Sequence, residues 1–576
     1  MKRWFKYIKP YLGYFIFGPV CMIVEVIGEV VMPKLLASVI NSANDGTLTN
    51  ESSIGTMFLM ILTAILMMAG GVGGAYFASK ASVNFAADLR SDMYSRVQAF
   101  SFANIDKFST GSLVTRLTND VTQVQNFIAM LLRMALRAPG MMIAALVMAI
   151  LIKPSLSVVF AVSIPLMLVT LVFIVRTGFM RFSKMQEKID ALNSNVQENV
   201  TNVRVVKSFV REEYSGKGFR KANKELKDSG IRAMSVMIFL SPIMTLFMNA
   251  TIIAVILIGG RIVLRGDMSV GDLSAFITYV TQILSSLLMI TFLIMMSSRA
   301  MASGKRINEV MDEKLDVTDE NAACPDKKVE NGEIEFRHVS FRYYKDSEDE
   351  VLSDINLTIP ANSIVGIIGS TGSGKSTLVS MIPRLYDCDQ GEVLVDGVNV
   401  RDYSLVNLRD GIGMVLQKNT LFSGSIADNL RWGDEFATDE EVRQFAEYAQ
   451  ADKFVSTFSE GYDTPLDQGG TNVSGGQKQR LCIARALLKK PKILILDDST
   501  SAVDTATEAQ IRRAFREELQ GSTKIIIAQR ISSVRDADMI VVVNEGRITG
   551  IGKHEDLLRD NVEYREIYES QSGKEE

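Results

Sequence analysis

The N-terminal half of the chain contains six long apolar stretches separated by charged segments. A helix that crosses a bilayer needs about 20 predominantly apolar residues, and each stretch is long enough. The stretches lie near residues 12–40, 57–79, 129–152, 155–176, 233–260 and 272–298. The first is too long for a cleavable signal peptide and lacks a convincing small-residue cleavage site. The pattern therefore predicts six membrane-spanning helices.

The distribution of lysine and arginine predicts the orientation of these helices. Basic residues precede the first stretch, residues 41–56 contain none, and residues 80–128 and 177–232 are rich in both. The N-terminus and the two basic segments are therefore expected in the cytoplasm. Both segments are amphipathic, so we expect helices that continue far below the membrane and meet in turns at Phe102–Phe108 and Phe209–Tyr214. Plain solvated helix is the alternative.

Beyond residue 333 the pattern changes to short β-branched runs that alternate with amphipathic segments. The runs are Ile334–Phe336, Ile364–Ile368, Ile493–Leu496, Ile525–Ile527 and Ile540–Val543. Such alternation predicts an α/β domain around a largely parallel sheet. The expected organisation is an α-helical membrane domain with six spans (residues 1–313), a polar linker (314–332) and an α/β domain (333–576).

Composition agrees with a membrane part joined to a soluble part. Of 576 residues, 47% are hydrophobic and 22% are charged. The formal net charge of −4 and the lack of a basic tail give no reason to expect nucleic acid as a partner. Four scattered cysteines without metal-ligand or redox spacing indicate isolated thiols in a reducing compartment.

Two carboxylates, Glu25 and Glu29, lie four residues apart inside the first predicted span. Charge at membrane depth is costly, so such residues usually line a cavity or find a partner. One interpretation is a polar, cation-attracting or proton-binding patch on a translocation route. The other is structural pairing with a basic residue such as Lys34, or a position near the headgroups. Arg133 and Arg137 are expected to snorkel at the cytoplasmic end of the third span.

One motif in the C-terminal half carries specific chemistry. The segment after the strand Ile364–Ile368 matches G-x-x-x-x-G-K-[ST] and precedes a helical stretch. In this setting backbone N–H groups and a helix N-terminus surround phosphate oxygens. Lys375 is expected to reach the β- and γ-phosphates of ATP, and Ser376 to bind Mg²⁺. The predicted nucleotide-binding residues here are Gly369, Ser370, Thr371, Gly372, Ser373, Gly374, Lys375, Ser376 and Thr377.

Two further segments fit the same chemistry. Asp497 follows four aliphatic residues, which is the setting of a Walker B carboxylate that holds Mg²⁺. Val473–Gln477 opens a helix that continues through Lys489, with small residues where a phosphate can approach the helix N-terminus.

With these motifs in place, the chain resembles a half-transporter of the ATP-binding-cassette (ABC) exporter family over nearly its whole length. The resemblance implies that Tyr343 stacks on adenine, and that Gln417 is the Q-loop glutamine that contacts Mg²⁺. Ser474, Gly475, Gly476 and Gln477 would form the signature motif, with Val473 in place of leucine. Ser501–Asp504, ending in Asp504, would form the D-loop. The two cytoplasmic turns would be coupling helices that dock on nucleotide domains.

At two positions the sequence departs from the family pattern. Asp498 stands where a catalytic glutamate normally polarises water, and Gln529 stands where a histidine normally contacts the γ-phosphate. In the family, each ATP lies between the Walker motifs of one chain and the signature of the other. The resemblance therefore implies the degenerate-site subunit of a heterodimeric bacterial exporter, whose intact signature serves a second, non-identical half-transporter.

The expected function is ATP-driven export of amphipathic small molecules, drug-like or lipid-like, by alternating access. The chain is expected in the bacterial inner (plasma) membrane, with its nucleotide-binding domain in the cytoplasm. One alternative is a homodimeric exporter in which Asp498 and Gln529 support ATP hydrolysis in place of the glutamate and the histidine. An ATP-gated channel or regulator is another.

Overall fold

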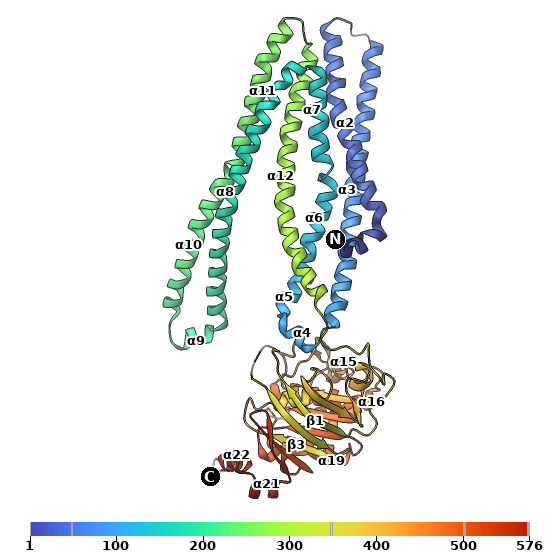
Figure 1. Ribbon diagram of the computed structural model, residues 1–576, viewed down its shortest axis with the longest axis vertical. Helices are drawn as coiled ribbons and strands as arrows, with labels where there is room; N and C mark the ends of the chain where they lie inside the picture. Colours follow the sequence, from blue (N-terminus) through green and yellow to red (C-terminus); the bar gives the residue numbers. More distant parts are fainter. Residues whose placement is uncertain (1, 48–49, 346, 348, 499–502, 573–576) are drawn as a thin grey trace. The chain divides into compact units, whose positions relative to one another are not determined.

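The computed structural model describes residues 2–47, 50–345, 347, 349–498 and 503–572. Two compact units divide these residues. The helical unit comprises Met1–Ser95 and Leu113–Asp312, and the sheet unit comprises Arg96–Ser112 and Glu313–Glu576. Each unit is described below by itself (Figure 1).

Six helical segments of the helical unit are long and apolar enough to cross a membrane, which confirms the six predicted spans. Several are far longer than a span requires: α8 has 48 residues and is about 70 Å long at 1.5 Å per residue. The prediction of helices that extend well beyond the bilayer is therefore confirmed. The helices are α1 (Lys2–Ile8), α2 (Leu12–Asn44), α3 (Asn50–Gln98), α5 (Thr110–Thr115), α6 (Val121–Met134), α7 (Arg137–Ile152), α8 (Pro154–Thr201), α10 (Glu212–Ile238), α11 (Leu240–Leu264) and α12 (Val270–Asp312).

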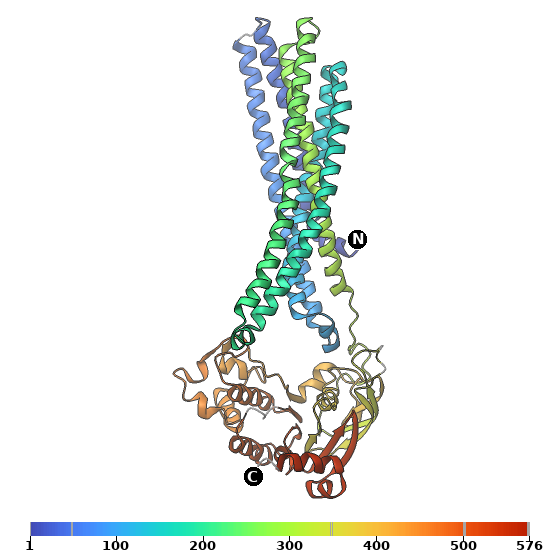
Figure 2. The ribbon, with the colours of Figure 1, turned by 90° about the vertical axis from the view of Figure 1, so that its left-hand side faces the viewer.

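The helices α8 and α10 run side by side as a hairpin, joined by the short helix α9 (Val203–Ser208) (Figure 1 and Figure 2). The second cytoplasmic turn was expected at Phe209–Tyr214, and that position is only partly right. The short helix lies before it, and Tyr214 already belongs to α10. At its far end α10 stops at Ile238, because Pro242 has no N–H to donate to the Ile238 carbonyl.

The sheet unit contains two main sheets, not one. A six-stranded sheet has the order β12-β11-β3-β10-β9-β6, in which β12 is antiparallel and the other pairs are parallel. Its strands are β3 (Ile364–Ile368), β6 (Ile412–Val415), β9 (Ile493–Asp497), β10 (Thr523–Ile527), β11 (Met539–Asn544) and β12 (Arg547–Gly552). The predicted parallel sheet is therefore confirmed.

The first predicted strand belongs instead to a separate antiparallel sheet of order β2-β1-β4-β5, which the sequence did not lead us to expect. Its strands are β1 (Ile334–Phe341), β2 (Leu352–Ile359), β4 (Gln390–Val395) and β5 (Val398–Asn399), and a two-stranded sheet pairs β7 (Gly424–Ser425) with β8 (Pro465–Leu466). The helices are α4 (Phe102–Lys107), α13 (Lys375–Ser380), α14 (Leu405–Asp410), α15 (Ile426–Leu430), α16 (Asp439–Tyr448), α17 (Asp452–Val455), α18 (Gly475–Leu488), α19 (Thr505–Glu517), α20 (Ile531–Val534), α21 (His554–Asp560) and α22 (Val562–Ser572).

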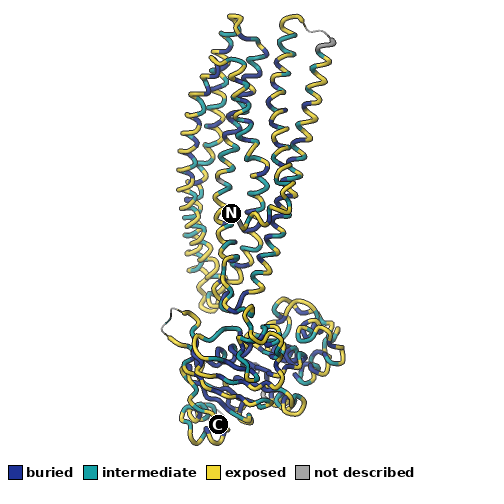
Figure 3. The backbone as a smooth tube through the Cα atoms, turned by 45° about the vertical axis from the view of Figure 1, so that its right-hand side comes forward, coloured by how far each residue is buried: buried dark blue, intermediate teal, exposed yellow. Residues whose placement is uncertain are grey.

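The parallel strands are buried on both faces, which explains their uninterrupted apolar sequence. In β9, Ile493 and Ile495 pack with the antiparallel sheet, whereas Leu494 and Leu496 pack with α16, α18 and α19. This division follows the two-residue period of a strand. Figure 3 shows the buried strands in dark blue, whereas the spanning helices present many exposed apolar residues, as a lipid-facing or partner-facing surface requires.

One carboxylate accepts four of the hydrogen bonds that hold the segment before β1 on the sheet unit. Asp396, at the end of β4, accepts hydrogen bonds from the backbone N–H groups of Glu330, Asn331, Gly332 and Glu333 at 2.7–3.1 Å. Val329 is buried in the core beside them. Residues 314–332, which the sequence suggested as a linker, therefore end in a segment that is held rigidly on the sheet.

We predict that Asp396→Asn loosens this segment. A hydrogen bond to a charged acceptor contributes about 1.5–3 kcal/mol, so amide exchange at residues 330–333 should accelerate roughly 10-fold or more. Hydrogen-exchange mass spectrometry of the full chain measures this directly. Asp439→Asn is the control, because Asp439 forms only an exposed ion pair with Arg431. Equal protection of residues 330–333 in all three proteins would contradict the assigned role of Asp396.

Candidate nucleotide site and membrane cavity

At two positions of the loop between β3 and α13, the backbone conformation and the close neighbours require glycine. Gly369 has φ +158°, and a Cβ there would lie 1.9 Å from the Val543 carbonyl oxygen. Gly374 has φ +97°, and a Cβ there would lie 2.9 Å from a Leu352 methyl group and from the Val351 carbonyl oxygen. These glycines bring the backbone close to its neighbours and aim the loop over the start of α13. Such a loop can surround phosphate oxygens.

Lys375 is held at the mouth of this loop. Its Nζ donates to the carbonyl oxygens of Gly369 and Ser370 at 2.9 and 2.6 Å. The side chain is buried, and burial lowers the pKa of Lys375, against the opposing charges of Asp497 and Asp498. A poorly solvated ammonium ion interacts strongly with an anion, so this lysine suits the β- and γ-phosphates of ATP.

Ser376 and Asp497 lie side by side, as the motif spacing predicts. The Ser376 hydroxyl donates to Asp497 Oδ1 at 2.8 Å, and Asp497 ends the buried strand β9. Burial raises the pKa of Asp497, which means that the carboxylate would gain from a nearby cation. One hydroxyl, one carboxylate and nucleotide phosphates form the oxygen-only donor set that Mg²⁺ prefers. The residues present therefore fit Mg·ATP.

Asp498 has an unusual environment. Its backbone is left-handed, with φ +48°, a conformation that aspartate tolerates better than most residues. Gln529 Nε2 donates to Asp498 Oδ2 at 2.8 Å, and the Gln417 side chain also hydrogen-bonds to the same carboxylate. Burial raises the pKa of Asp498, and these two amides oppose that rise. The structure therefore brings together the three residues that the sequence singled out at this edge, Asp498, Gln529 and Gln417.

The segment Ser474–Gln477 is a well-formed helix start. The Ser474 hydroxyl accepts from the Gln477 backbone N–H at 3.3 Å, and Gln477 Oε1 accepts from the Ser474 N–H at 2.9 Å. This capping box fixes the first turn of α18. Ser474 and Gly475 are exposed, and Gly476 follows them in α18. The N-terminus of this helix is therefore accessible to a ligand or to a second chain.

Asp504 caps another helix. Its Oδ1 accepts from the Thr507 N–H at 2.9 Å at the start of α19. Ser501 and Ala502, which precede it in the predicted D-loop, lie outside the described residues. Thr371, Gly372 and Ser373 lie in the loop before α13, and Thr377 lies in its first turn.

Tyr343 lies beside the phosphate-binding loop and contacts residues on both sides, Thr377 in α13 and Tyr386 beyond it. Its hydroxyl shares a hydrogen bond of 2.8 Å with Thr377 Oγ1. Its ring meets Tyr386 edge to face, with the ring centroids 5.3 Å apart. Tyr386 was not singled out from the sequence, because a lone tyrosine near a turn has no distinctive signal. It nevertheless connects Tyr343 to α4.

The helix α4 belongs to the sheet unit, although most of α3 before it and the second half of α5 after it belong to the helical unit. Tyr386 donates from its hydroxyl to Asp106 Oδ2 at 2.9 Å, and the ring centroids of Tyr386 and Phe102 are 6.1 Å apart. Burial and this hydrogen bond raise the pKa of Tyr386. A continuous path therefore runs from Thr377 through Tyr343 and Tyr386 to the turn that the sequence predicted at Phe102–Phe108.

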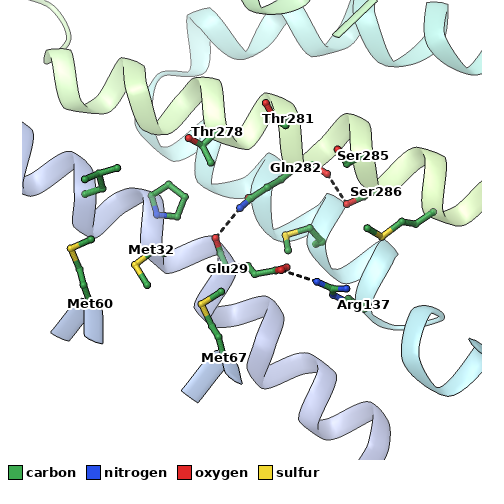
Figure 4. Close-up of a pocket in the computed structure, with 14 residues that line it drawn as sticks. Glu29, Met32, Met60, Met67, Arg137, Thr278, Thr281, Gln282, Ser285 and Ser286 are labelled. Carbon is green, nitrogen blue, oxygen red and sulfur yellow. Dashed lines mark hydrogen bonds and ion pairs between the residues drawn. The ribbon is translucent and has the colours of Figure 1, made fainter. Parts of the chain in front are cut away.

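The carboxylates of the first span are paired, but not with the residue that we expected. Arg137 Nη2 lies 2.7 Å from Glu29 Oε1 (Figure 4). The same nitrogen lies 3.1 Å from Glu25 Oε1. The expectation that Arg137 snorkels toward the cytoplasm is therefore wrong, because two acidic partners on α2 hold it inside the helical unit. Glu29 and Arg137 line a cavity of about 440 Å³ between α2, α3, α7 and α12.

Comparisons with known proteins agree with this arrangement. Residues 15–287 match the model of the ABC transporter transmembrane region, and residues 352–501 match that of the ABC transporter. The chain is 38% identical over 577 residues to "Uncharacterized ABC transporter ATP-binding protein YfiB" of Bacillus subtilis (strain 168), covering 100% of this chain and 99% of that protein.

Two further similarities extend over nearly the whole chain. The "ATP-dependent lipid A-core flippase" of Syntrophus aciditrophicus (strain SB) is 31% identical, covering 99% of this chain and 94% of the relative. A solved "bacterial Atm1-family ABC exporter with ATP bound" superposes with a TM-score of 0.80 at 25% identity, covering 98% of each chain. Membrane helices, ATPase domain and full-length relatives together show that this chain is a multi-pass membrane protein of the ABC transporter family, a half-transporter of the exporter type whose C-terminal domain is an ATPase.

Proposed function

We propose that this chain is the degenerate-site subunit of a heterodimeric ATP-driven exporter in the bacterial inner membrane. Its own Walker motifs bind Mg·ATP but hydrolyse it slowly. Its signature motif completes the competent site, whose Walker motifs belong to a non-identical partner. The observation that carries this proposal is the hydrogen bond of 2.8 Å between Gln529 and Asp498.

That hydrogen bond concerns the two positions where the sequence departs from the family. Asp498 is one methylene shorter than glutamate, and two glutamine amides engage its carboxylate. An amide carries no titratable proton at neutral pH, so Gln529 cannot act as an acid or a base. A general base typically contributes about 10²- to 10⁴-fold in rate, or about 3 to 5 kcal/mol of barrier. A site that lacks this contribution turns over slowly.

The binding parts of the site support retention of ATP. The loop Gly369–Lys375 and the Ser376–Asp497 pair have the geometry that phosphate and Mg²⁺ need. The signature segment is also intact, well capped and exposed. In a homodimer, this intact signature would face a second copy of the same defective Walker site and would support no hydrolysis. The intact signature therefore favours a non-identical partner whose Walker site has the catalytic glutamate and the histidine. Dimerisation itself follows from membership of the exporter family.

Export then proceeds by alternating access. ATP binding closes the two nucleotide domains, and the path from Thr377 to α4 carries this closure toward the spanning helices. Hydrolysis at the partner's site resets the cycle. Transport requires that the substrate bind the inward and outward states with different affinity. Amphipathic small molecules are the substrates we propose, and the similarity to a lipid A-core flippase keeps lipid-like molecules within that class.

The first prediction concerns the missing catalytic contacts. In the assembled complex, with the partner's site silenced by Ser474→Ala, adding Asp498→Glu and Gln529→His should raise ATP hydrolysis about 10-fold or more. The reason is that the longer carboxylate and the histidine restore a base and a γ-phosphate contact. Steady-state ATPase measurement tests this. Asp498→Asn with Gln529→His, which has no carboxylate, should give no rise. An unchanged rate in the first variant would count against the proposed defect.

The second prediction concerns which of the two ATP sites hydrolyses ATP, the one with this chain's Walker motifs or the one with the partner's. Ser474→Ala should lower the ATPase rate of the complex about 100-fold, because it removes a hydrogen-bond donor at the partner's ATP. Asp498→Asn should have little effect. Thr438→Ala is the matched control: Thr438 forms the same capping box at the start of α16 but belongs to no nucleotide motif. The reverse order of damage, or brisk hydrolysis by this chain purified alone, would overturn the proposal.

The third prediction concerns coupling through α4. Tyr386→Phe keeps the aromatic contacts and removes the hydrogen bond to Asp106. We expect near-normal basal ATP hydrolysis but a severalfold loss of stimulation by transported compounds, since α4 is held less firmly. Tyr448→Phe, which removes an exposed hydroxyl on α16, should change neither quantity. Equal loss of basal and stimulated activity would indicate a folding defect instead of a coupling role.

A further inference from the structure

The cavity beside Glu29 lies at membrane depth. Glu29 and Arg137 each lie 15 residues before the outer ends of their helices, Asn44 and Ile152. At 1.5 Å per residue this places both about 22 Å from those ends, within a hydrocarbon core about 30 Å thick. Five methionines from α2, α3, α7 and α12 form much of the wall (Figure 4): Met32, Met60, Met67, Met141 and Met289. Methionine is polarisable and adapts to ligands of irregular shape.

The charges beside the cavity do not cancel. A single nitrogen of Arg137 contacts one oxygen of Glu25 and one of Glu29. Two carboxylates therefore share one guanidinium group, which leaves one negative charge. Net charge at this depth is costly and marks a functional site in membrane proteins. A ligand that brings a positive charge would relieve that cost.

Two side-chain oxygens of residues that line the cavity are buried and have no hydrogen-bond donor among the described residues. They are Glu29 Oε2 and Gln282 Oε1. The Gln282 amide is held in place because its Nε2 donates to the Glu29 carbonyl at 2.8 Å. Its free oxygen and the free Glu29 oxygen are thus fixed acceptors, and leaving such atoms unpaired costs about 1–3 kcal/mol each.

The hydroxyl groups of the wall add to this excess of acceptors. Thr278, Thr281 and Ser286 all donate to carbonyl oxygens one turn earlier in α12, at 3.2, 3.2 and 2.7 Å. With their hydrogens engaged, they offer only lone pairs to the cavity. Arg137 and Ser285 are the lining residues that can still donate, and Arg137 is already paired with Glu25 and Glu29. The other polar groups of the wall that are named here favour a ligand that donates.

We propose that this cavity binds the N–H-bearing cationic group of an amphipathic substrate, a primary or secondary ammonium or a guanidinium. The N–H groups donate to Glu29 Oε2 and Gln282 Oε1, and the methionines contact the apolar body. A quaternary ammonium carries the same charge but no N–H, and it leaves both oxygens unpaired. This inference rests on the proposed export function, whose substrate class it narrows.

The test compares two fluorescent probes of equal charge, dansylcadaverine and its N,N,N-trimethyl analogue. Each is titrated into the full chain, with its co-purified partner, in lipid nanodiscs without nucleotide. The primary ammonium should bind about 10-fold or more tightly than the quaternary probe. Glu29→Gln should weaken the primary ammonium about 10- to 100-fold and reduce the preference severalfold.

Gln282→Leu provides a second variant should Glu29→Gln fold poorly, and it should reduce the preference severalfold. Glu309→Gln is the matched control. Glu309 lies on α12, as Gln282 does, and forms an ion pair with Arg116, but it does not line the cavity. Equal affinity of the native protein for both probes, or equal weakening of both by Glu29→Gln, would overturn the inference. Because binding is measured without turnover, a failure here is distinct from a failure of the ATPase predictions.

Discussion

The contact between Gln529 and Asp498 is the constraint on which the functional interpretation depends. It joins the ends of β10 and β9, two neighbouring parallel strands, at the edge where the phosphate-binding loop also begins. Parallel strands bring their carboxyl ends to one edge, so the Walker motifs, Asp498 and Gln529 must meet there. A glutamine at this edge satisfies a partly buried carboxylate by hydrogen bonding. A histidine there could also exchange a proton. Under the proposed function, Asp498 and Gln529 are held together by a hydrogen bond and lack the proton exchange that a histidine would allow.

Binding and hydrolysis of ATP depend on different parts of this domain, so one can be retained without the other. Phosphate binding depends on backbone geometry and on Lys375, which glycines and burial fix locally. Hydrolysis depends on a carboxylate positioned toward water. The first property survives changes at Asp498 and Gln529, because neither residue shapes the loop. The Tyr343–Tyr386–α4 path starts from the loop as well. Under the proposed function, a nucleotide that is held but not cleaved can therefore still influence α4.

The membrane spans, the parallel sheet and the phosphate-binding loop could be predicted from the sequence, because each has a strong local pattern. Continuous apolar runs gave the spans and the parallel strands, and the spacing of glycines gave the phosphate loop. The antiparallel sheet was missed because its strand β1 alternates irregularly, with register shifts at Phe336–Val339 and Val339–Phe341. The second turn was placed too late because Val203–Ser208 is itself helical, so the sequence shows no clear break where α8 ends at Thr201. The Arg137 pairing was missed because contacts between α2 and α7 join residues over 100 positions apart.

The same long-range contacts have a mechanical consequence. Arg137 ties α7 to α2, and Gln282 ties α12 to α2 through the Glu29 carbonyl. Three spanning helices therefore meet at one polar point in mainly apolar surroundings. If these helices shift relative to one another, the two fixed acceptor oxygens separate, and a cation bound between them loses one of its hydrogen bonds. That loss is a differential affinity between two states, which is the one property that coupling of transport to ATP requires.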